Sequence, residues 1–235
     1  MPHLNRLLAA ASPHDLAHLE AHLERVSMKA RQVMEAPGKV VDYVYFPETC
    51  VASALALTGQ DQRIEIALVG CEGMSGTTLV LGDDRSPHSV YVQIPGEALR
   101  MEGKVFLKLL NDKPELRCYL LKFAQVFMVQ AAQTAVANGK AKLTERMARW
   151  ILMAHDRTVS DDVPLTHEFL ALMLGVRRAS VTVAMNDFEK AGLVAVRRGE
   201  ITVVNRKGIE KVAGSFYGVP EAEYRRLIHY DTRAG

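Results

Sequence analysis

The chain has 235 residues, of which 49% are hydrophobic, 24% charged and 6% aromatic. These values are typical of a soluble globular protein with one large or two modest domains, and they exclude wholesale disorder and fibrous repeats. The formal net charge of +2 gives no indication of a polyanionic partner.

The sequence contains few patterns typical of a membrane-spanning segment or of disulfide bonds. The longest apolar stretch near the start is Leu7–Ala11, and no run approaches the ~18–20 residues that cross a bilayer. We therefore expect a cytoplasmic protein with no membrane partner. The cysteines Cys50, Cys71 and Cys118 lack metal-ligand spacing, so we expect buried thiols, with redox sensing as the open alternative.

Residues 33–99 predict a β domain. Short apolar runs alternate with breaks that contain proline or glycine, which is the pattern of an all-β sandwich or barrel. An amphipathic segment, Pro13–Val26, precedes them and has leucines at helical spacing. The apolar runs are Val40–Phe46, Val51–Leu57, Ile64–Val69, Thr77–Leu81 and Ser89–Ile94.

A long helix is predicted next. Asn111 and Asp112 suit its N-cap, Pro114 its first turn, and Asn138-Gly139 its end. About 24 residues of helix would span roughly 36 Å. One apolar stripe is close to coiled-coil spacing and predicts a dimer interface, while the alternative is packing on the chain's own β domain. This stripe comprises Leu116, Leu120, Phe123, Phe127, Ala131 and Thr134.

Residues 166–193 carry the clearest functional signal. Thr166 suits the N-cap of a helix that ends at Gly175, and a second helix runs on to Lys190 with Gly192 as its stop. Two short helices joined by a tight glycine turn form a helix-turn-helix unit. The second helix has an apolar core face made of Val181, Ala184, Met185 and Phe188.

The opposite face of the second helix predicts DNA binding. Arginine pairs with guanine in the major groove, and hydroxyls and N-terminal amides suit phosphates. Val194–Val196 and Ile201–Val204 predict a β-hairpin, which makes the unit a winged helix. The predicted DNA contacts are Thr166, His167, Arg177, Arg178, Ser180, Thr182, Val183, Arg197 and Arg198.

The order of a β domain, a long helix and a winged helix-turn-helix resembles the Crp/Fnr superfamily of bacterial transcription regulators. Further resemblance lies in the segments APGKVVDYVYFPETC, GCEGMSGTTLVLG and ERMARWILMAHDR. It implies an α+β fold with an N-terminal, jelly-roll-like β-roll (a double-stranded β-helix) as sensor domain. The implied parts are a sensor domain over 1–112, a dimerisation helix over 113–138, a DNA-binding domain over 139–218 and a tail over 219–235.

The resemblance also implies a function. The chain is expected to be a homodimer that binds a palindromic operator in double-stranded DNA, with RNA polymerase as a further partner and with no catalytic residues. The tail contains Tyr224, Leu227 and Ile228, which are compatible with a short docked helix, and an unpacked tail is the open alternative. Ala179 and Val183 stand where cyclic-AMP regulators carry an acidic residue and a second arginine, so a different operator is expected.

The effector pocket implied by the resemblance comprises Gly76, Thr77, Thr78, His88 and Ser89. Cyclic-AMP regulators have a glutamate directly after the glycine and an arginine-serine pair further on. Here Thr77 and His88-Ser89 occupy the matching positions, so the arginine for the cyclic phosphate is missing. Cyclic AMP and cyclic GMP are therefore not expected, and the effector and any cofactor, heme included, stay open.

Two other classes of protein were weighed. A cupin-type metalloenzyme needs several histidines and a carboxylate on neighbouring strands, but His88 is the only histidine in residues 33–99, so neither an enzyme nor a metal site is expected. A signalling module could instead use the helix-turn-helix for protein contacts. Residues 139–235 contain 16 basic and 12 acidic residues, against 13 and 15 before them, which agrees with a DNA-facing C-terminal half.

Overall fold

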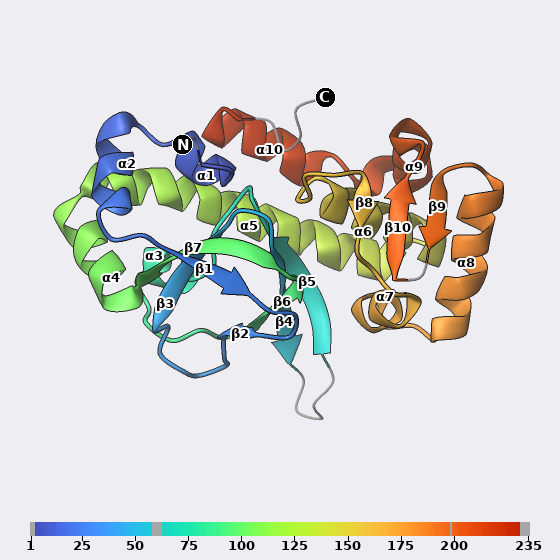
Figure 1. The fold of residues 1–235 in the computed structure, drawn as a ribbon, viewed down its shortest axis with the longest axis horizontal. Helices are drawn as coiled ribbons and strands as arrows, with labels where there is room; N and C mark the ends of the chain where they lie inside the picture. The colour runs from blue at the N-terminus through green and yellow to red at the C-terminus, as the bar shows by residue number, and fades with distance from the viewer. Residues whose placement is uncertain (1–2, 58–62, 198, 231–235) are drawn as a thin grey trace.

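The computed structural model describes residues 3–57, 63–197 and 199–230. An N-terminal β-roll and a C-terminal winged helix-turn-helix unit lie side by side, and one long helix runs behind both (Figure 1). This arrangement confirms the predicted α+β architecture.

The β-roll consists of two antiparallel sheets. Apolar residues of both sheets, such as Tyr45 and Ala98 from one and Ala52 and Val92 from the other, pack in the core between them. The first sheet has the order β1 (Glu24–Met28), β7 (Gly96–Glu102), β3 (Tyr43–Pro47). The second has the order β2 (Val33–Glu35), β6 (Ser89–Ile94), β4 (Val51–Leu57), β5 (Arg63–Val69).

Two predictions for this half of the chain are wrong. The run Thr77–Leu81 is helix α3, bounded by Gly76 and Gly82 with positive φ, because a short apolar run does not by itself distinguish a strand from a helix. The predicted helix Pro13–Val26 ends at Glu20, and the residues after it pair as β1 with β7. The helices of this half are α1 (Arg6–Ala9), α2 (Pro13–Glu20), α3 and α4 (Gly103–Asp112).

The long helix α5 (Pro114–Lys140) has 27 residues and is longer than predicted. Asn111 and Asp112 do not cap it, because they belong to α4, and the N-cap is Lys113. Gly139 lies inside the last turn instead of ending the helix. Pro114 occupies the first turn, as predicted.

The stripe predicted as a dimer interface faces the chain's own core. Leu116, Leu120 and Phe123 are almost fully buried and belong to one cluster with residues of α1 and α4. Thr134 is buried as well, and Phe127 and Ala131 are half-buried. The four buried side chains are not accessible for a dimer contact in this conformation and pack on the chain's own β domain, as the alternative expected. For Phe127 and Ala131, which stay partly accessible, the dimer contact remains a prediction.

By length and composition alone, α5 would suffice to cross a membrane, and within the described residues it is the one helix of which this is true. The core helix of a soluble protein meets the same criterion. The inner face of α5 packs on the β-roll.

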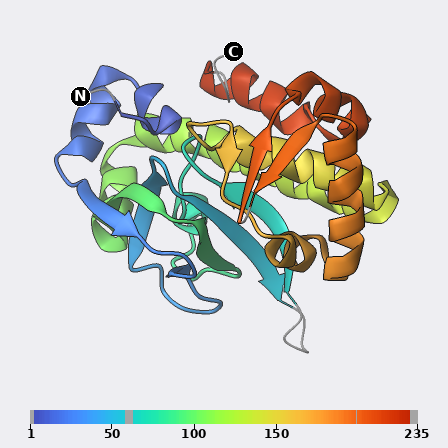
Figure 2. The ribbon, with the colours of Figure 1, turned by 45° about the vertical axis from the view of Figure 1, so that its right-hand side comes forward.

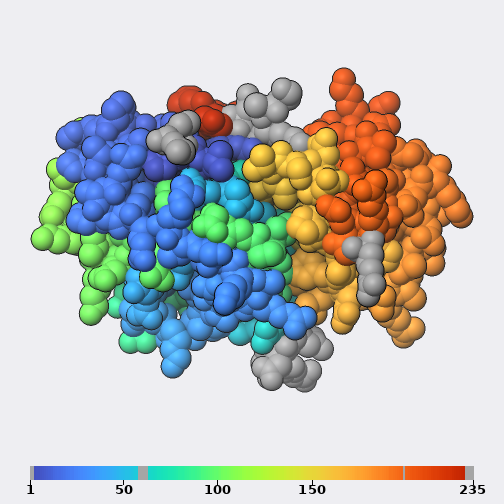
Figure 3. All heavy atoms as spheres, in the orientation of Figure 1, coloured from blue at the N-terminus to red at the C-terminus, as the bar shows by residue number. Residues whose placement is uncertain are grey.

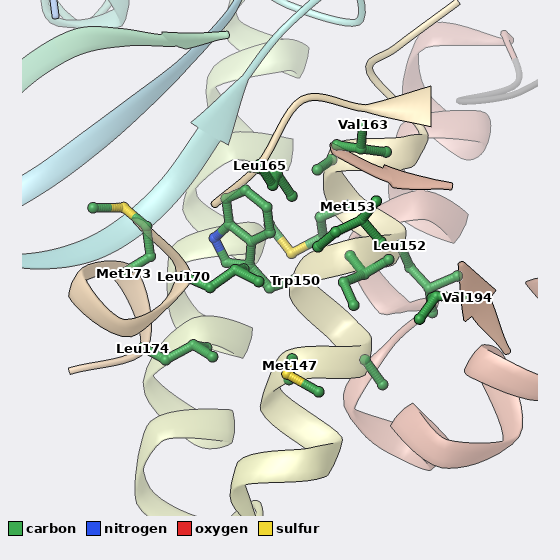
Figure 4. Packing of buried hydrophobic residues seen from close by; sticks show 14 of the residues in the cluster. Met147, Trp150, Leu152, Met153, Val163, Leu165, Leu170, Met173, Leu174 and Val194 are labelled. Atoms are coloured by element: carbon green, nitrogen blue, oxygen red, sulfur yellow. The ribbon is translucent and has the colours of Figure 1, made fainter. Parts of the chain in front are cut away.

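The C-terminal unit confirms the predicted winged helix-turn-helix (Figure 2). Its three-stranded sheet has the order β8–β10–β9. Its core gathers residues of α6, α7 and the strands around Trp150 (Figure 4). The elements are α6 (Leu143–His155), β8 (Asp162–Val163), α7 (His167–Leu174), α8 (Arg178–Lys190), β9 (Val194–Arg197), β10 (Glu200–Val203), α9 (Arg206–Ala213) and the 3-10 turn η1 (Gly214–Phe216).

The last helix, α10 (Val219–Ile228), returns from the winged unit to the β-roll. Figure 1 shows α10 beside α1. Tyr224 and Ile228 of α10 are buried in the same cluster as Leu7 and Leu8 of α1. Of the two alternatives for the tail, residues 219–228 thus form the docked helix.

Candidate nucleic-acid interface and effector pocket

The turn between α7 and α8 has the geometry that its sequence predicts. The Thr166 side chain caps α7 by accepting a hydrogen bond from the backbone N–H of Phe169 at 3.2 Å. Gly175 ends α7 with φ of +62°, and a Cβ at this position would meet nothing within 4 Å. Glycine is thus required here for the left-handed backbone rather than for space.

Helix α8 is anchored by one face and free on the other. The predicted core residues Val181, Ala184, Met185 and Phe188 are all buried. In the space-filling view, helix α8 forms the outer edge of the molecule, away from the β-roll (Figure 3). Anchoring on one side holds the exposed side in a fixed orientation.

The exposed side of α8 begins with two arginines. Arg177 is the N-cap residue and Arg178 the first helical residue, and both are exposed. Within the described part of the chain, neither forms an ion pair. Ser180 and Val183 are also exposed. Free guanidinium groups at a helix N-terminus can reach both base edges and phosphates.

His167 and Thr182 join the two helices. The Thr182 hydroxyl lies 3.1 Å from His167 Nδ1 and donates a hydrogen bond to the Arg178 carbonyl oxygen at 3.1 Å. Both residues are half-buried. They hold the first turn of α8 against α7, and their predicted role as DNA contacts stays a prediction.

The hairpin after α8 forms the wing. Arg197 is the last residue of β9 and is exposed. In the antiparallel register of the hairpin it lies opposite Glu200 of β10. Arg198, also predicted to contact DNA, lies outside the described residues. The hairpin is fixed to α8 by a hydrogen bond from the Val196 N–H to the Glu189 side chain at 2.9 Å.

Arg146 supports the turn and was not found from the sequence. Its guanidinium donates to the carbonyl oxygen of Leu174, the last residue of α7. Burial lowers the pKa of Arg146. No local pattern distinguishes this arginine from a surface residue of an amphipathic helix, because its partner lies 28 positions away.

The predicted effector pocket is a cavity of about 20 Å³. Thr77, Thr78 and His88 line it, whereas the predicted residues Gly76 and Ser89 do not. Partial burial lowers the pKa of His88. Since a single water needs about 10–15 Å³ by this measure and ligand pockets usually reach hundreds of Å³, the cavity has room for little more than one water.

A carboxylate of the chain itself fills the polar end of this pocket. Glu35 Oε1 accepts a hydrogen bond from the N–H of Gly76 at 2.6 Å, and the side chain is buried. Burial raises the pKa of Glu35, opposed by hydrogen bonds from Ser86 and Gly76. The sequence did not indicate Glu35, which lies 41 positions from its partner.

The cysteines give little support to a redox or metal site. Burial raises the pKa of Cys50 to about 12 and that of Cys71 to about 11, which keeps both as unreactive thiols. Cys118 is exposed on α5, so the expectation of a buried thiol is wrong for this cysteine. Across residues 3–57, 63–197 and 199–230, no group of three or more histidines, cysteines or acidic residues could hold a metal ion.

Comparison with known proteins agrees with this geometry. Residues 145–212 match the family model of the Crp-like helix-turn-helix domain. This match runs from α6 to α9 and includes every predicted DNA contact. No curated protein matches the sequence significantly.

Solved structures of transcription regulators share the fold. FixK2 from Bradyrhizobium japonicum has a TM-score of 0.70 at 15% identity, covering 82% of this chain and 98% of its own. A putative Crp/Fnr-family regulator from Eubacterium rectale has a TM-score of 0.65 at 14% identity, with 88% and 97% covered. A CRP-family regulator from Thermus thermophilus has a TM-score of 0.65 at 18% identity, with 82% and 97% covered.

Proposed function

We propose that this chain is a DNA-binding transcription regulator of the Crp/Fnr type and that it binds a palindromic operator as a homodimer. The observation that carries the proposal is the free pair Arg177 and Arg178 on the first turn of an exposed helix whose other face is buried. Proteins of this type are regulators rather than enzymes, in line with the expectation from the sequence. The proposed location is the cytoplasm, and RNA polymerase is a proposed further partner.

In vitro selection of DNA with the purified full-length protein tests the proposal. A selected palindrome with half-sites about one helical turn apart, roughly 34–36 Å, would support both the class of protein and its symmetry. Binding should weaken steeply as salt rises, because phosphate contacts release counterions. A protein that retains no DNA above background would favour the alternative, in which the helix-turn-helix contacts another protein.

Replacing Arg178 with alanine is expected to weaken operator binding by about 1–3 kcal/mol and to relax the preference at one base position. The reason is the loss of a bidentate pair with guanine. Fluorescence anisotropy on the selected site and its single-base variants measures both effects. Arg226→Ala removes an exposed arginine of α10 and is the matched control, for which no change is expected. An equal loss on every sequence would instead make Arg178 a phosphate contact.

The outer side of α5 supports dimerisation. Six exposed residues follow one another at spacings of three, four, three, four and three, which is the heptad pattern of a left-handed coiled coil. Only Gln125 among them is a polar residue, and one polar position in such a seam sets register. This outer seam replaces the inner stripe predicted from the sequence and comprises Cys118, Leu121, Gln125, Met128, Ala132 and Ala135.

The small volume of the pocket supports a regulator that does not take a cyclic nucleotide. Cyclic AMP or cyclic GMP at millimolar concentration is expected to leave both the melting temperature and the operator affinity unchanged. A ligand at 100 times its Kd would stabilise the fold by about 2.7 kcal/mol, which differential scanning fluorimetry detects readily. A saturable rise in melting temperature with either nucleotide would contradict this expectation.

A further inference from the structure

Glu65, on strand β5 of the β-roll, reaches across to the winged unit. Its Oε1 accepts a hydrogen bond from Trp150 Nε1 on α6 at 2.6 Å, and its Oε2 accepts one from the Ser53 hydroxyl at 2.5 Å. Glu65 and Trp150 are both buried. The Trp150 ring lies between α6 and α7, beside Leu170 and Met173 (Figure 4). One carboxylate thus joins the sensor sheet to the centre of the DNA-binding unit.

Glu72, just beyond the end of β5, makes a second connection. Its Oε1 accepts a hydrogen bond from Arg157 Nε at 2.8 Å, and both side chains are buried. Arg157 also donates to the carbonyl oxygen of Met153 in α6. A Cβ on Gly70 would lie 2.7 Å from the Cβ of Arg157, so glycine allows this close approach.

The segment between these carboxylates is also fixed to α5. The Gln130 side chain accepts a hydrogen bond from the Leu68 N–H at 2.8 Å and donates one to the Leu68 carbonyl oxygen at 3.1 Å. Arg149 of α6 donates to the Thr134 hydroxyl of α5 at 3.1 Å. Strand β5 with the residues just beyond it, α5, and α6 with the following Arg157 are therefore connected at four separate places by buried polar groups.

Buried polar contacts of this kind define an orientation. Apolar surfaces can slide on one another at low cost, whereas a buried carboxylate that loses its partner is left desolvated and unpaired. Two such contacts, one within β5 and one just beyond its end, fix both the position and the angle of α6. Because α6 packs on α7 and the wing sheet, the angle of α6 sets the direction of α8.

We propose that Glu65 and Glu72 are positioning residues that set the orientation of the DNA-binding unit, and hence the half-site spacing that the dimer accepts. The inference rests on the proposed function, because spacing has meaning only for a dimer on a palindrome. Neither carboxylate is expected to touch DNA.

Operators with altered spacing test the inference. The selected palindrome is prepared with its centre shortened or lengthened by one and two base pairs, and the full-length protein is titrated with each by fluorescence anisotropy. Trp150→Phe removes the N–H that Glu65 accepts and keeps an aromatic ring. The double variant Glu72→Met/Arg157→Met replaces the ion pair with apolar side chains of similar length.

Wild-type protein is expected to prefer one spacing. In both variants, the ratio between the best and the next spacing should fall by about tenfold, the order of factor that one lost buried hydrogen bond supplies. The base preference within each half-site should stay the same. Unchanged spacing profiles in folded variants would overturn the inference, and Trp150→Phe is decisive if the double variant does not fold.

Phe169→Leu is the matched control. Phe169 packs edge-on against Trp150 within the winged unit, with ring centroids 5.8 Å apart, and its side chain has no group that could donate a hydrogen bond to either carboxylate. A merely structural weakening of this unit should lower the affinity by the same factor at every spacing. A wild-type protein with no preferred spacing would instead contradict the proposed dimeric function, so the two failures can be told apart.

Discussion

Replacing Leu121 and Met128 of α5 with glutamate is expected to convert the dimer into monomers and to lower operator affinity by at least about 100-fold. Both side chains lie in the outer seam and are exposed in the single chain, so the substitution leaves the core intact. In the dimer, four carboxylates would face one another across a desolvated seam. A monomer also loses the gain in affinity that comes from binding two half-sites at once.

Sedimentation equilibrium at micromolar concentration and anisotropy on the selected operator measure this result. Val33→Glu, at an exposed apolar position of β2, is the control and should stay dimeric. Phe123→Glu, on the buried face of the same helix, should unfold the β-roll instead of producing a folded monomer. A double variant that still sediments as a dimer would show that another surface holds the two chains together.

A native cysteine offers an independent check of the same seam. Cys118 begins the outer seam and is exposed. In a parallel, in-register coiled coil, two copies of one heptad position face each other. A short thiol-specific crosslinker should therefore join two wild-type chains but not two chains of Cys118→Ser.

Glu65→Gln is expected to remove a pH dependence of stability. Burial raises the pKa of Glu65 to about 7, more strongly than the hydrogen bonds from Ser53 and Trp150 and the charge of Arg149 lower it. The folded protein thus holds a proton that the unfolded chain releases above its ordinary pKa of about 4.3. The free energy of unfolding should fall by about 3 kcal/mol as the pH rises from 4.5 to 7.

Chemical denaturation at pH 5, 6, 7 and 8 measures this dependence. The difference in stability between wild type and Glu65→Gln is the informative quantity, because other titrating groups cancel in it. Relative to the variant, wild type should lose stability up to about pH 7 and then level off. Glu102→Gln, at an exposed carboxyl, should keep the wild-type slope. A constant difference across the range would rule out a proton on Glu65.

The helix-turn-helix could be predicted because its signals are local. Thr166 caps α7, Gly175 supplies the left-handed residue, and the apolar spacing of α8 defines its core face, all within one short segment. Each of these features acts on backbone that lies at most a few residues away. Long-range structure is not needed to interpret them.

The faces of α5 could not be assigned in this way. Its inner stripe with Phe123 and its outer seam with Leu121 both follow helical apolar spacing, and spacing alone does not tell which partner covers which face. The inner stripe has larger side chains than the outer seam, so the sequence pattern favours the inner stripe as the interface. Burial by α1, α4 and α10 decides the matter.

The polar groups that close the pocket and join the domains were missed for a related reason. Glu35 and Gly76 are 41 positions apart, and Glu65 and Trp150 are 85 apart. A single glutamate on a strand is an ordinary surface residue unless its partner is known. Only the folded chain brings these groups together.

The shared core of α1 and α10 has a consequence for how the chain folds during synthesis. Leu7 and Leu8 of α1 are synthesised before the DNA-binding unit, and Tyr224 and Ile228 of α10, which pack with them, are synthesised after it. The sensor core therefore stays partly uncovered while the DNA-binding unit is made. Because α10 completes this core, a nascent chain that stalls before α10 cannot yet have a complete sensor core.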